Sequence, residues 1–379
     1  MTKAVIVGYV RSPFSLANKG QLIKVRADEM AAQVVKGVVA RTGVTPSDIE
    51  DLLLGCSFPE GEQGLNVARL IALYAGLPLS VGGATINRFC GSSMQSVHTA
   101  VGAIACGAGD VFICGGVESM TRVPMGGFNP MPNPTLYAQM PGAYMSMGET
   151  AENVAKRYNI SRAEQDAFAV ESQKKAAAAQ EAGKLKDEII PIVMKGETVA
   201  EADTCLRPTT TLEGLAGLAP AFEEDGSVTA GTSSPLTDGA SAVLVCSEDY
   251  AKQHGMTPMA RVKSFAVTGC DPEIMGIGPV GATKKALARA GLTINDIDII
   301  ELNEAFASQS IACVRDLSID MKKVNLDGGA IAIGHPLGAT GARIVGKAAS
   351  LLQREGKKYA LATQCIGGGQ GIATILEAL

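Results

Sequence analysis

Cys90 lies at a point in the sequence where a thiol could act as a nucleophile. A strand-like run over 84–86 leads into it, and a helical pattern over 93–105 follows. A thiol at a helix N-terminus has its anion favoured by the helix dipole and by free N–H groups. Gly91 is expected to permit the tight bend. Taken alone, the pattern still fits an inert buried cysteine better, so Cys90 is at this point a candidate nucleophile.

His335 is the histidine best placed for proton transfer among the three in the chain. His98 falls inside an apolar helical pattern, where a packed imidazole is expected, and His254 falls in a polar turn, where a solvated one is expected. His335 belongs to G-G-A-I-A-I-G-H-P-L-G-A-T-G-A-R, in which a strand-like run meets glycines before a helix that starts near Ala339. An imidazole in such a loop can transfer protons or stabilise an oxyanion.

Two further segments place polar side chains directly after apolar runs. Cys365 stands in A-T-Q-C-I-G-G-G-Q-G, where three glycines after a strand expose backbone N–H groups. Such a loop could also cradle a phosphate, but no G-x-G-x-x-G follows the first strand and no G-x-x-x-x-G-K occurs. Asn303, in E-L-N-E-A-F-A, suits either a turn or the orientation of a water molecule.

The elements that must position these residues repeat along the chain. Residues 39–49 (V-A-R-T-G-V-T-P-S-D-I) correspond to residues 287–297 (L-A-R-A-G-L-T-I-N-D-I). In both copies an amphipathic helix ends at a glycine, Gly43 or Gly291, which suits a helix C-cap. An apolar, strand-like run follows each copy. The repeat predicts two similar α/β halves.

The composition changes between the two halves. Residues 120–147 are rich in Met, Pro and Gly and are expected to form a loop that covers something. Helical patterns follow over 150–157 and from Ser161 towards 182, the second opened by a capping box with Glu164. Residues 196–231 are polar and loop-like.

These changes predict three units. An inserted loop domain spans 117–235, an N-terminal half spans 1–116 plus 236–255, and a C-terminal half spans 256–379. Helices that alternate with apolar runs, such as 111–114 and 240–246, favour α/β layers around largely parallel sheets.

The composition narrows the classes of function. The chain has 379 residues, 46% apolar and 19% charged, with a net charge of -5, which argues against nucleic acid as a partner. No apolar run is long enough for a membrane span, and no signal peptide is recognised, so a cytoplasmic location is expected. Nine cysteines without a C-x-x-C pair indicate a reducing compartment and no metal site.

Four segments together resemble the active-site motifs of the thiolase family, in the family's order and approximate spacing. They are N-R-F-C-G-S-S, N-E-A-F-A, G-H-P-L-G-A-T-G and C-I-G-G-G-Q-G. The resemblance extends from the first strand to the C-terminus. It implies an α/β fold with duplicated αβαβα layered halves and an inserted loop domain, which agrees with the repeat and the insertion.

The resemblance also implies a role for each candidate. Cys90 would be the acylated nucleophile, activated by His335. His335 and a water held by Asn303 would form one oxyanion hole, and the backbone N–H groups of Cys90 and Gly367 would form a second. Cys365 would be the general acid and base.

Coenzyme A is the implied co-substrate, with no tightly bound cofactor and no metal. Ser234, in T-A-G-T-S-S-P, matches the family serine near the pantetheine, and Met275 lies in a family pocket segment. One departure is Ala219, where relatives often carry an Arg that helps to bind the CoA nucleotide. Another is Ser146, where acetoacetyl-CoA-specific relatives commonly carry His.

Ser146 and the N-R-F-C-G-S-S motif favour the degradative branch of the family. Such an enzyme cleaves 3-ketoacyl-CoA with CoA to acetyl-CoA and a shortened acyl-CoA, in fatty acid β-oxidation. The alternatives are an acetoacetyl-CoA thiolase that works in the condensing direction, a condensing enzyme of the ketoacyl synthase type, and a partner-docked subunit of a fatty acid oxidation complex. A homodimer or homotetramer is implied.

Overall fold

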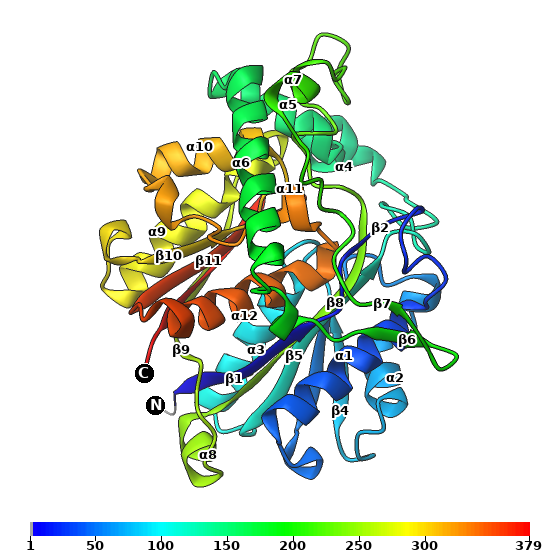
Figure 1. Cartoon of the computed structure of the whole chain (residues 1–379), viewed down its shortest axis with the longest axis vertical. Helices are drawn as coiled ribbons and strands as arrows, with labels where there is room; N and C mark the ends of the chain where they lie inside the picture. The colour runs from blue at the N-terminus through cyan, green and yellow to red at the C-terminus, as the bar shows by residue number, and fades with distance from the viewer. Residues whose placement is uncertain (1–2) are drawn as a thin grey trace.

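The computed structural model describes residues 3–379, in which one large mixed sheet carries most of the strands (Figure 1). Its strands are β1 (Ala4–Arg11), β2 (Ser15–Leu16), β3 (Asp51–Gly55), β4 (Gly82–Ile86), β5 (Val111–Ser119), β8 (Thr237–Ser247), β9 (Ala260–Gly269), β10 (Ile299–Leu302), β11 (Tyr359–Ile366) and β12 (Gln370–Glu377). A separate two-stranded sheet pairs β6 (Ile192–Met194) with β7 (Glu197–Ala200).

The helices cover both faces of the large sheet and fill the insertion. They are α1 (Ala27–Thr42), α2 (Val67–Tyr74), α3 (Ser92–Ala105), α4 (Pro134–Gln139), α5 (Met147–Arg157), α6 (Arg162–Glu181), α7 (Leu212–Ala216), α8 (Glu248–Gln253), α9 (Gly278–Ala290), α10 (Ala307–Leu317), α11 (Ala330–Ile333) and α12 (Leu337–Glu355). No helix of the described part is long and apolar enough to cross a bilayer.

The predicted duplication is confirmed by the strand order. The large sheet runs β10-β11-β12-β9-β1-β8-β5-β3-β4. The strands β3-β5-β8-β1 of the first half are equivalent to β10-β11-β12-β9 of the second, and β4 is an extra edge strand of the first half. The two halves meet where β1 pairs with β9. Gly43 and Gly291 both adopt the left-handed conformation, with φ of 64° and 66°, and both cap the preceding helix as expected.

The expectation of largely parallel sheets is wrong. Only β3–β4, β3–β5 and β10–β11 are parallel pairs within the large sheet, and its other strand pairs are antiparallel. In the second half, a short turn joins β11 to β12, and a connection that short can only produce antiparallel neighbours. In the first half, the whole insertion lies between the antiparallel neighbours β5 and β8.

Five layers follow from the way the helices bury their apolar faces. One core packs α1 and α2 against the first half of the sheet, and another packs α9 against the second half. Between the halves, α3 and α12 share a third core that receives apolar side chains from strands of both. The αβαβα arrangement is therefore as expected.

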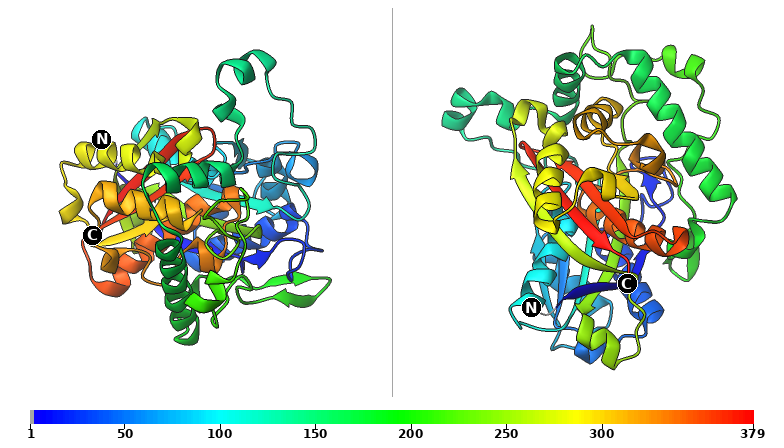
Figure 2. Two further views of the ribbon diagram at one scale, coloured as in Figure 1. Left: turned by 90° about the horizontal axis from the view of Figure 1, so that it is seen from above. Right: turned by 90° about the vertical axis from the view of Figure 1, so that its left-hand side faces the viewer.

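The insertion leaves the sheet after β5 and returns at β8. Helix α6 starts where the sequence predicts, with a capping box at Ser161. Helix α5 starts at Met147, three residues before the predicted start at 150, because Ser146 also forms a capping box. The segment that contains α4 projects from the body of the molecule (Figure 2). Two details differ from expectation, since α7 forms within the polar region 196–231 and the apolar run Ala330–Ile333 is a helical turn instead of a strand.

Candidate active site

Cys90, His335 and Cys365 line one cavity of about 240 Å³ between the insertion and the two halves. The predicted CoA-contact residues Ser234 and Met275 line it too. The three chemical groups come from three different elements: the turn after β4, the loop between α11 and α12, and β11. The fold therefore brings together residues that are separated by up to 275 positions in the chain (365 minus 90).

A strained turn presents Cys90 to the cavity. Phe89 adopts a φ of 42°, which is unfavourable for a residue with a bulky side chain, whereas Gly91 has an ordinary φ of −81°. The expectation that Gly91 serves the bend is therefore wrong. Gly91 gives room to Ile366 instead, because a Cβ there would lie 2.6 Å from Cδ1 of Ile366 and would push that side chain aside.

Burial keeps Cys90 protonated, contrary to the expectation that the helix N-terminus favours thiolate. Desolvation raises the pKa of the thiol to about 12, and the buried carboxyl group of Glu118 adds to the rise. The N–H groups of Gly367 and of Cys90 itself act in the opposite direction. Because burial dominates, Cys90 is a thiol at neutral pH and needs a base to become a nucleophile.

His335 is held at both ring nitrogens. Its Nδ1 lies 2.6 Å from Oγ1 of Thr340, and that hydroxyl lies 3.2 Å from the carbonyl oxygen of Pro336. A hydroxyl that donates its one proton to Pro336 must accept from Nδ1–H, which leaves the lone pair on Nε2. Nε2 then accepts from Nδ2 of Asn303 at 3.4 Å.

The imidazole is neutral at neutral pH. Burial lowers the pKa of His335 to about 3, and the nearby guanidinium of Arg343 contributes in the same direction. Because the contact with Asn303 is long, the lone pair on Nε2 is only weakly engaged and can accept a proton from a thiol in the same cavity. Asn303 does not line the cavity itself, but its Oδ1 is buried without a hydrogen-bond donor among residues 3–379.

The β11–β12 hairpin carries Cys365 and Gly367 to Cys90. Gly368 and Gly369 form its turn with φ of 78° and 82°. Burial raises the pKa of the Cys365 thiol well above its ordinary value, and the neighbouring Cys90 adds to the rise. Cys365 is therefore a protonated thiol at neutral pH.

Two buried polar residues that support the site were not singled out from the sequence. Gln364 donates from Nε2 to the backbone carbonyl of Cys90 and so joins the hairpin to the nucleophile turn. Glu118, near the end of β5, accepts hydrogen bonds from the backbone N–H groups of Ser57 at 2.8 Å and of Gly338 at 2.9 Å. An acidic residue that closes an otherwise apolar strand run was the available signal for Glu118.

The insertion supplies the apolar wall of the cavity. Phe222 packs against Gly148 so closely that a Cβ on the glycine would lie 2.0 Å from the ring. Ser146 lines the cavity while its hydroxyl caps α5. Ala219, the predicted departure from the family pattern, is exposed.

The methionines of 120–147 divide into two groups. Met120, Met125 and Met147 line the cavity, with Met125 at its exposed rim, whereas Met131 and Met140 are exposed and lie outside it. Met145 is not part of the lining and contacts the side chain of Asn153. The segment thus contributes both of its ends to the cavity, while its middle belongs to the projecting part around α4.

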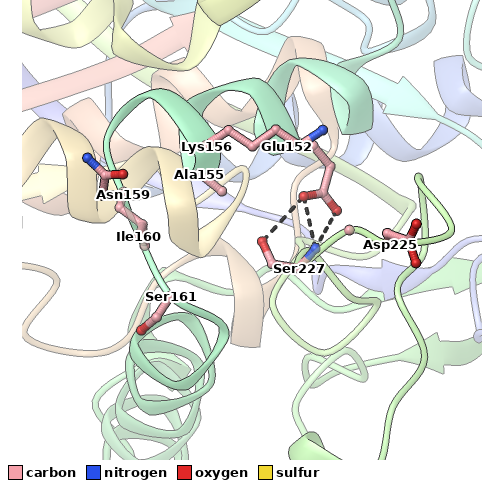
Figure 3. Close-up of a pocket in the computed structure, with 9 residues that line it drawn as sticks. Glu152, Ala155, Lys156, Asn159, Ile160, Ser161, Asp225 and Ser227 are labelled. Carbon is pink, nitrogen blue, oxygen red and sulfur yellow. Dashed lines mark hydrogen bonds between the residues drawn. The ribbon is translucent and has the colours of Figure 1, made fainter.

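A second depression, of about 290 Å³, lies farther along α5 (Figure 3). The carboxylate of Glu152, which lines this depression, accepts hydrogen bonds from the backbone N–H groups of Ser227 at 3.0 Å and of Val228 at 2.8 Å. Because these bonds occupy the carboxylate, Glu152 ties the 223–229 loop to α5. The depression contains none of the predicted site residues.

The other two histidines behave as expected. His98 is buried in α3, where it stacks on Phe265 and contacts Thr374. His254 caps α8, is partly exposed and stacks on Tyr250. Among residues 3–379, no group of three or more His, Cys, Asp or Glu side chains could hold a metal ion.

The chain matches known proteins over nearly its whole length, in sequence and in structure. Residues 4–249 match the family model described as "Thiolase, N-terminal domain", and residues 256–378 match "Thiolase, C-terminal domain". The chain is 47% identical over 389 aligned positions to "3-ketoacyl-CoA thiolase" of Bacillus subtilis and 48% identical over 388 to that of Vibrio vulnificus, with 100% of each chain covered. Among solved structures it is similar to human mitochondrial 3-ketoacyl-CoA thiolase in complex with CoA, with a TM-score of 0.91 and 39% identity, over 100% of this chain and 98% of that one.

Proposed function

The chain belongs to the thiolase family of acyltransferases, and on that premise we propose that it cleaves 3-ketoacyl-CoA with CoA to acetyl-CoA and a shortened acyl-CoA. One observation carries the proposal: Cys90, His335 and Cys365 surround a single cavity, and the N–H of Gly367 faces the Cys90 thiol. The names of the relatives support the degradative direction, in fatty acid β-oxidation.

The first half-reaction breaks the carbon–carbon bond. Nε2 of His335 takes the proton of Cys90, and the thiolate attacks the 3-keto carbon. The carbonyl becomes an oxyanion, which then reforms the carbonyl as the bond between C2 and C3 breaks. Cys365 gives its proton to C2 of the departing acetyl-CoA enolate, and the acyl group stays on Cys90 as a thioester.

The second half-reaction releases the product. The Cys365 thiolate takes the proton of the incoming CoA thiol, and the CoA sulfur attacks the thioester on Cys90. The shortened acyl-CoA leaves, and the Cys90 sulfur regains its proton from His335. Both cysteines and the imidazole return to their starting states, so the cycle needs no metal and no tightly bound cofactor.

Two donor sets serve the negative oxygen. The N–H groups of Cys90 and Gly367 both point towards the Cys90 sulfur, beside which the tetrahedral carbon forms, so they can donate hydrogen bonds to its oxyanion. The second set is His335 with a water held by Asn303, whose buried and otherwise unpaired Oδ1 can accept a hydrogen bond from that water. Donors fixed before the reaction stabilise the developing charge without reorganisation.

Coenzyme A enters as a co-substrate. Ser234, Met275 and the apolar wall of Phe222 are the proposed contacts of its pantetheine arm. The similar human thiolase was solved in complex with CoA, which supports this use of the cavity. Because Ala219 is not basic, the CoA phosphates require other partners than the Arg found in many relatives.

Two alternative functions, a ketoacyl synthase and an acetoacetyl-CoA thiolase, differ from this proposal in ways that can be distinguished. A ketoacyl synthase would not place a second cysteine at the nucleophile, so Cys365 opposes that reading. An acetoacetyl-CoA thiolase of the condensing direction would act on the shortest substrate alone. Thiolysis measured across a series of 3-ketoacyl-CoA chain lengths should extend beyond acetoacetyl-CoA, and activity confined to acetoacetyl-CoA would contradict the degradative proposal.

We expect Met125→Phe and Met147→Phe to narrow the range of chain lengths. Flexible thioether side chains adapt to ligands of different length, and a rigid ring in their place leaves less room. The kcat/KM for long-chain substrates should fall about tenfold more than that for acetoacetyl-CoA. Met131→Phe, on the exposed part of the same segment, is the control and should change neither value. An equal loss at every length would mean that these methionines only pack.

We further propose that the chain forms a homodimer, or a homotetramer built from two such dimers. We also propose that it works in the cytoplasm and that the oligomer can dock to a fatty acid oxidation complex. The outer strand β4 is only half-buried along its whole length. Its apolar side chains Ala84 and Ile86, and Val101 of the neighbouring helix α3, are also half-exposed. An open strand edge beside such a face is an expected pairing surface.

Sedimentation at micromolar concentration should give at least a dimer. Ile86→Arg, which places a charge on the half-exposed face, should shift the protein towards monomer. Leu379→Arg, at an exposed position elsewhere, is the control and should leave the assembly unchanged. A monomeric wild-type protein would contradict the proposed assembly.

A further inference from the structure

One face of α12 carries a row of polar groups that begins at the catalytic histidine. Thr340, Arg343, Lys347 and Arg354 are spaced by three, four and seven residues, which places them on one side of a helix. Thr340 holds Nδ1 of His335. The three cations below it are matched by carboxylates from other elements: Glu301, Glu188 and Asp327.

The pair nearest to His335 is Arg343 with Glu301. Nη1 of Arg343 lies 2.7 Å from Oε2 of Glu301, and the side chains are 2% and 1% exposed. Glu301 belongs to β10, two residues before Asn303, so the two side chains fall on the same side of an extended chain. Arg343 is one helical turn from Thr340. The ion pair therefore joins the two segments that hold the two nitrogens of His335.

We propose that Glu301 and Arg343 are positioning residues, whose ion pair sets the distance between Asn303 and Thr340 and so holds the His335 ring in place for proton transfer with Cys90. The Asn303 contact with Nε2 is long, at 3.4 Å, so a small shift of β10 relative to α12 would break it. The catalytic role of this ion pair rests on the proposed function, whereas its effect on the position of His335 does not depend on that function.

The surroundings support a tight coupling. A buried ion pair that loses one partner leaves an uncompensated charge in a medium of low dielectric. Burial raises the pKa of Glu301 to about 7, while Arg343 and Lys347 lower it and Asp327 and Glu188 raise it. Tyr9 packs on α12 against Gly346, and its pKa is raised by burial. The positive charge of Arg343 is close enough to lower the pKa of His335 as well.

Opposite charges accompany one another throughout the wider network. It contains four cations, Arg11, Arg343, Lys347 and Arg354, and five carboxylates, Glu188, Asp203, Glu301, Asp327 and, at the exposed end beside Arg354, Glu355. Arg354, about three turns beyond Arg343, makes its own ion pair with Asp327 at 2.6 Å and lies far from His335 along the helix. It therefore offers a matched control on the same helix face.

The test compares Glu301→Gln and Arg343→Lys with the control Arg354→Gln. Three quantities are measured for each: kcat and KM for thiolysis, the rate of Cys90 alkylation by iodoacetamide across pH, and the melting temperature. In both test variants we expect kcat to fall about tenfold or more, with KM for CoA within about twofold. The alkylation rate near neutral pH should fall in parallel, because the base is misplaced. Arg354→Gln should leave kcat and alkylation within about twofold, whatever its effect on melting.

Wild-type kcat and alkylation in Glu301→Gln would overturn the proposal. An equal loss of kcat in Arg354→Gln would do the same, because it would assign the effect to stability. If one test variant fails to fold, the other decides. The alkylation arm separates this inference from the proposed function: a wild-type protein without thiolase activity defeats the function, whereas alkylation still slowed by Glu301→Gln would uphold the positioning of His335.

Discussion

Cys90→Ser should lower the rate of thiolysis by at least about 10³-fold, because the reaction loses its nucleophile. A hydroxyl is a far weaker acid than a thiol, and burial already raises the pKa of Cys90 to about 12. His335 would have to take its proton from a group that is several orders of magnitude less acidic than the Cys90 thiol. The measurement is the initial rate with a 3-ketoacyl-CoA and saturating CoA.

Cys246→Ser is the matched control for this substitution. Cys246 is buried in β8 and lies outside the cavity. Its replacement introduces the same hydroxyl at a buried position, so it should cost some thermal stability and leave kcat within about twofold. A Cys90→Ser enzyme that keeps more than a tenth of the wild-type rate would show that another residue carries the acyl group.

Cys365→Ala should lower turnover by about 10²- to 10⁴-fold, the usual contribution of a general acid or base. Burial and the neighbouring Cys90 raise the pKa of the Cys365 thiol well above its ordinary value. It is therefore protonated when the enolate leaves, and its thiolate is strongly basic when CoA arrives. Without it, both half-reactions lose their proton carrier.

Alkylation distinguishes the role of Cys365 from that of Cys90. In Cys365→Ala the thiol of Cys90 and its base His335 are still present, so iodoacetamide should modify Cys90 at a rate within a few-fold of the wild type. Loss of alkylation together with turnover would mean that Cys365 is needed to form the nucleophile. Near-normal thiolysis would instead point to a different proton carrier.

Patterns within short stretches of sequence predicted much of the fold. Glycine caps at Gly43 and Gly291 and the capping box at Ser161 depend on residues a few positions apart, so helix ends were predicted well. The repeat predicted two similar halves, which the strand order confirms. The sheet was expected to be largely parallel. The short glycine turn between β11 and β12 is a local sign of an antiparallel pair, but no local pattern records how β8 returns after the insertion.

The candidate site shows the same division. The motifs identified Cys90, His335 and Cys365, which the structure brings to one cavity. The ionisation of Cys90 was predicted in the wrong direction, because the helix N-terminus is visible in the sequence whereas the burial that outweighs it is a tertiary property. Glu301 and Arg343 were not singled out because their partnership exists only between distant elements.

Acyl transfer to the enzyme tests the central claim most directly. Wild-type protein incubated with an acyl-CoA, quenched in acid and digested should yield one peptide whose mass is increased by the acyl group, with the modification on Cys90. Addition of free CoA before the quench should remove the modification, because CoA is the acceptor of the second half-reaction. An acyl group mapped to any other cysteine, or one on Cys90 that CoA does not remove, would contradict the account.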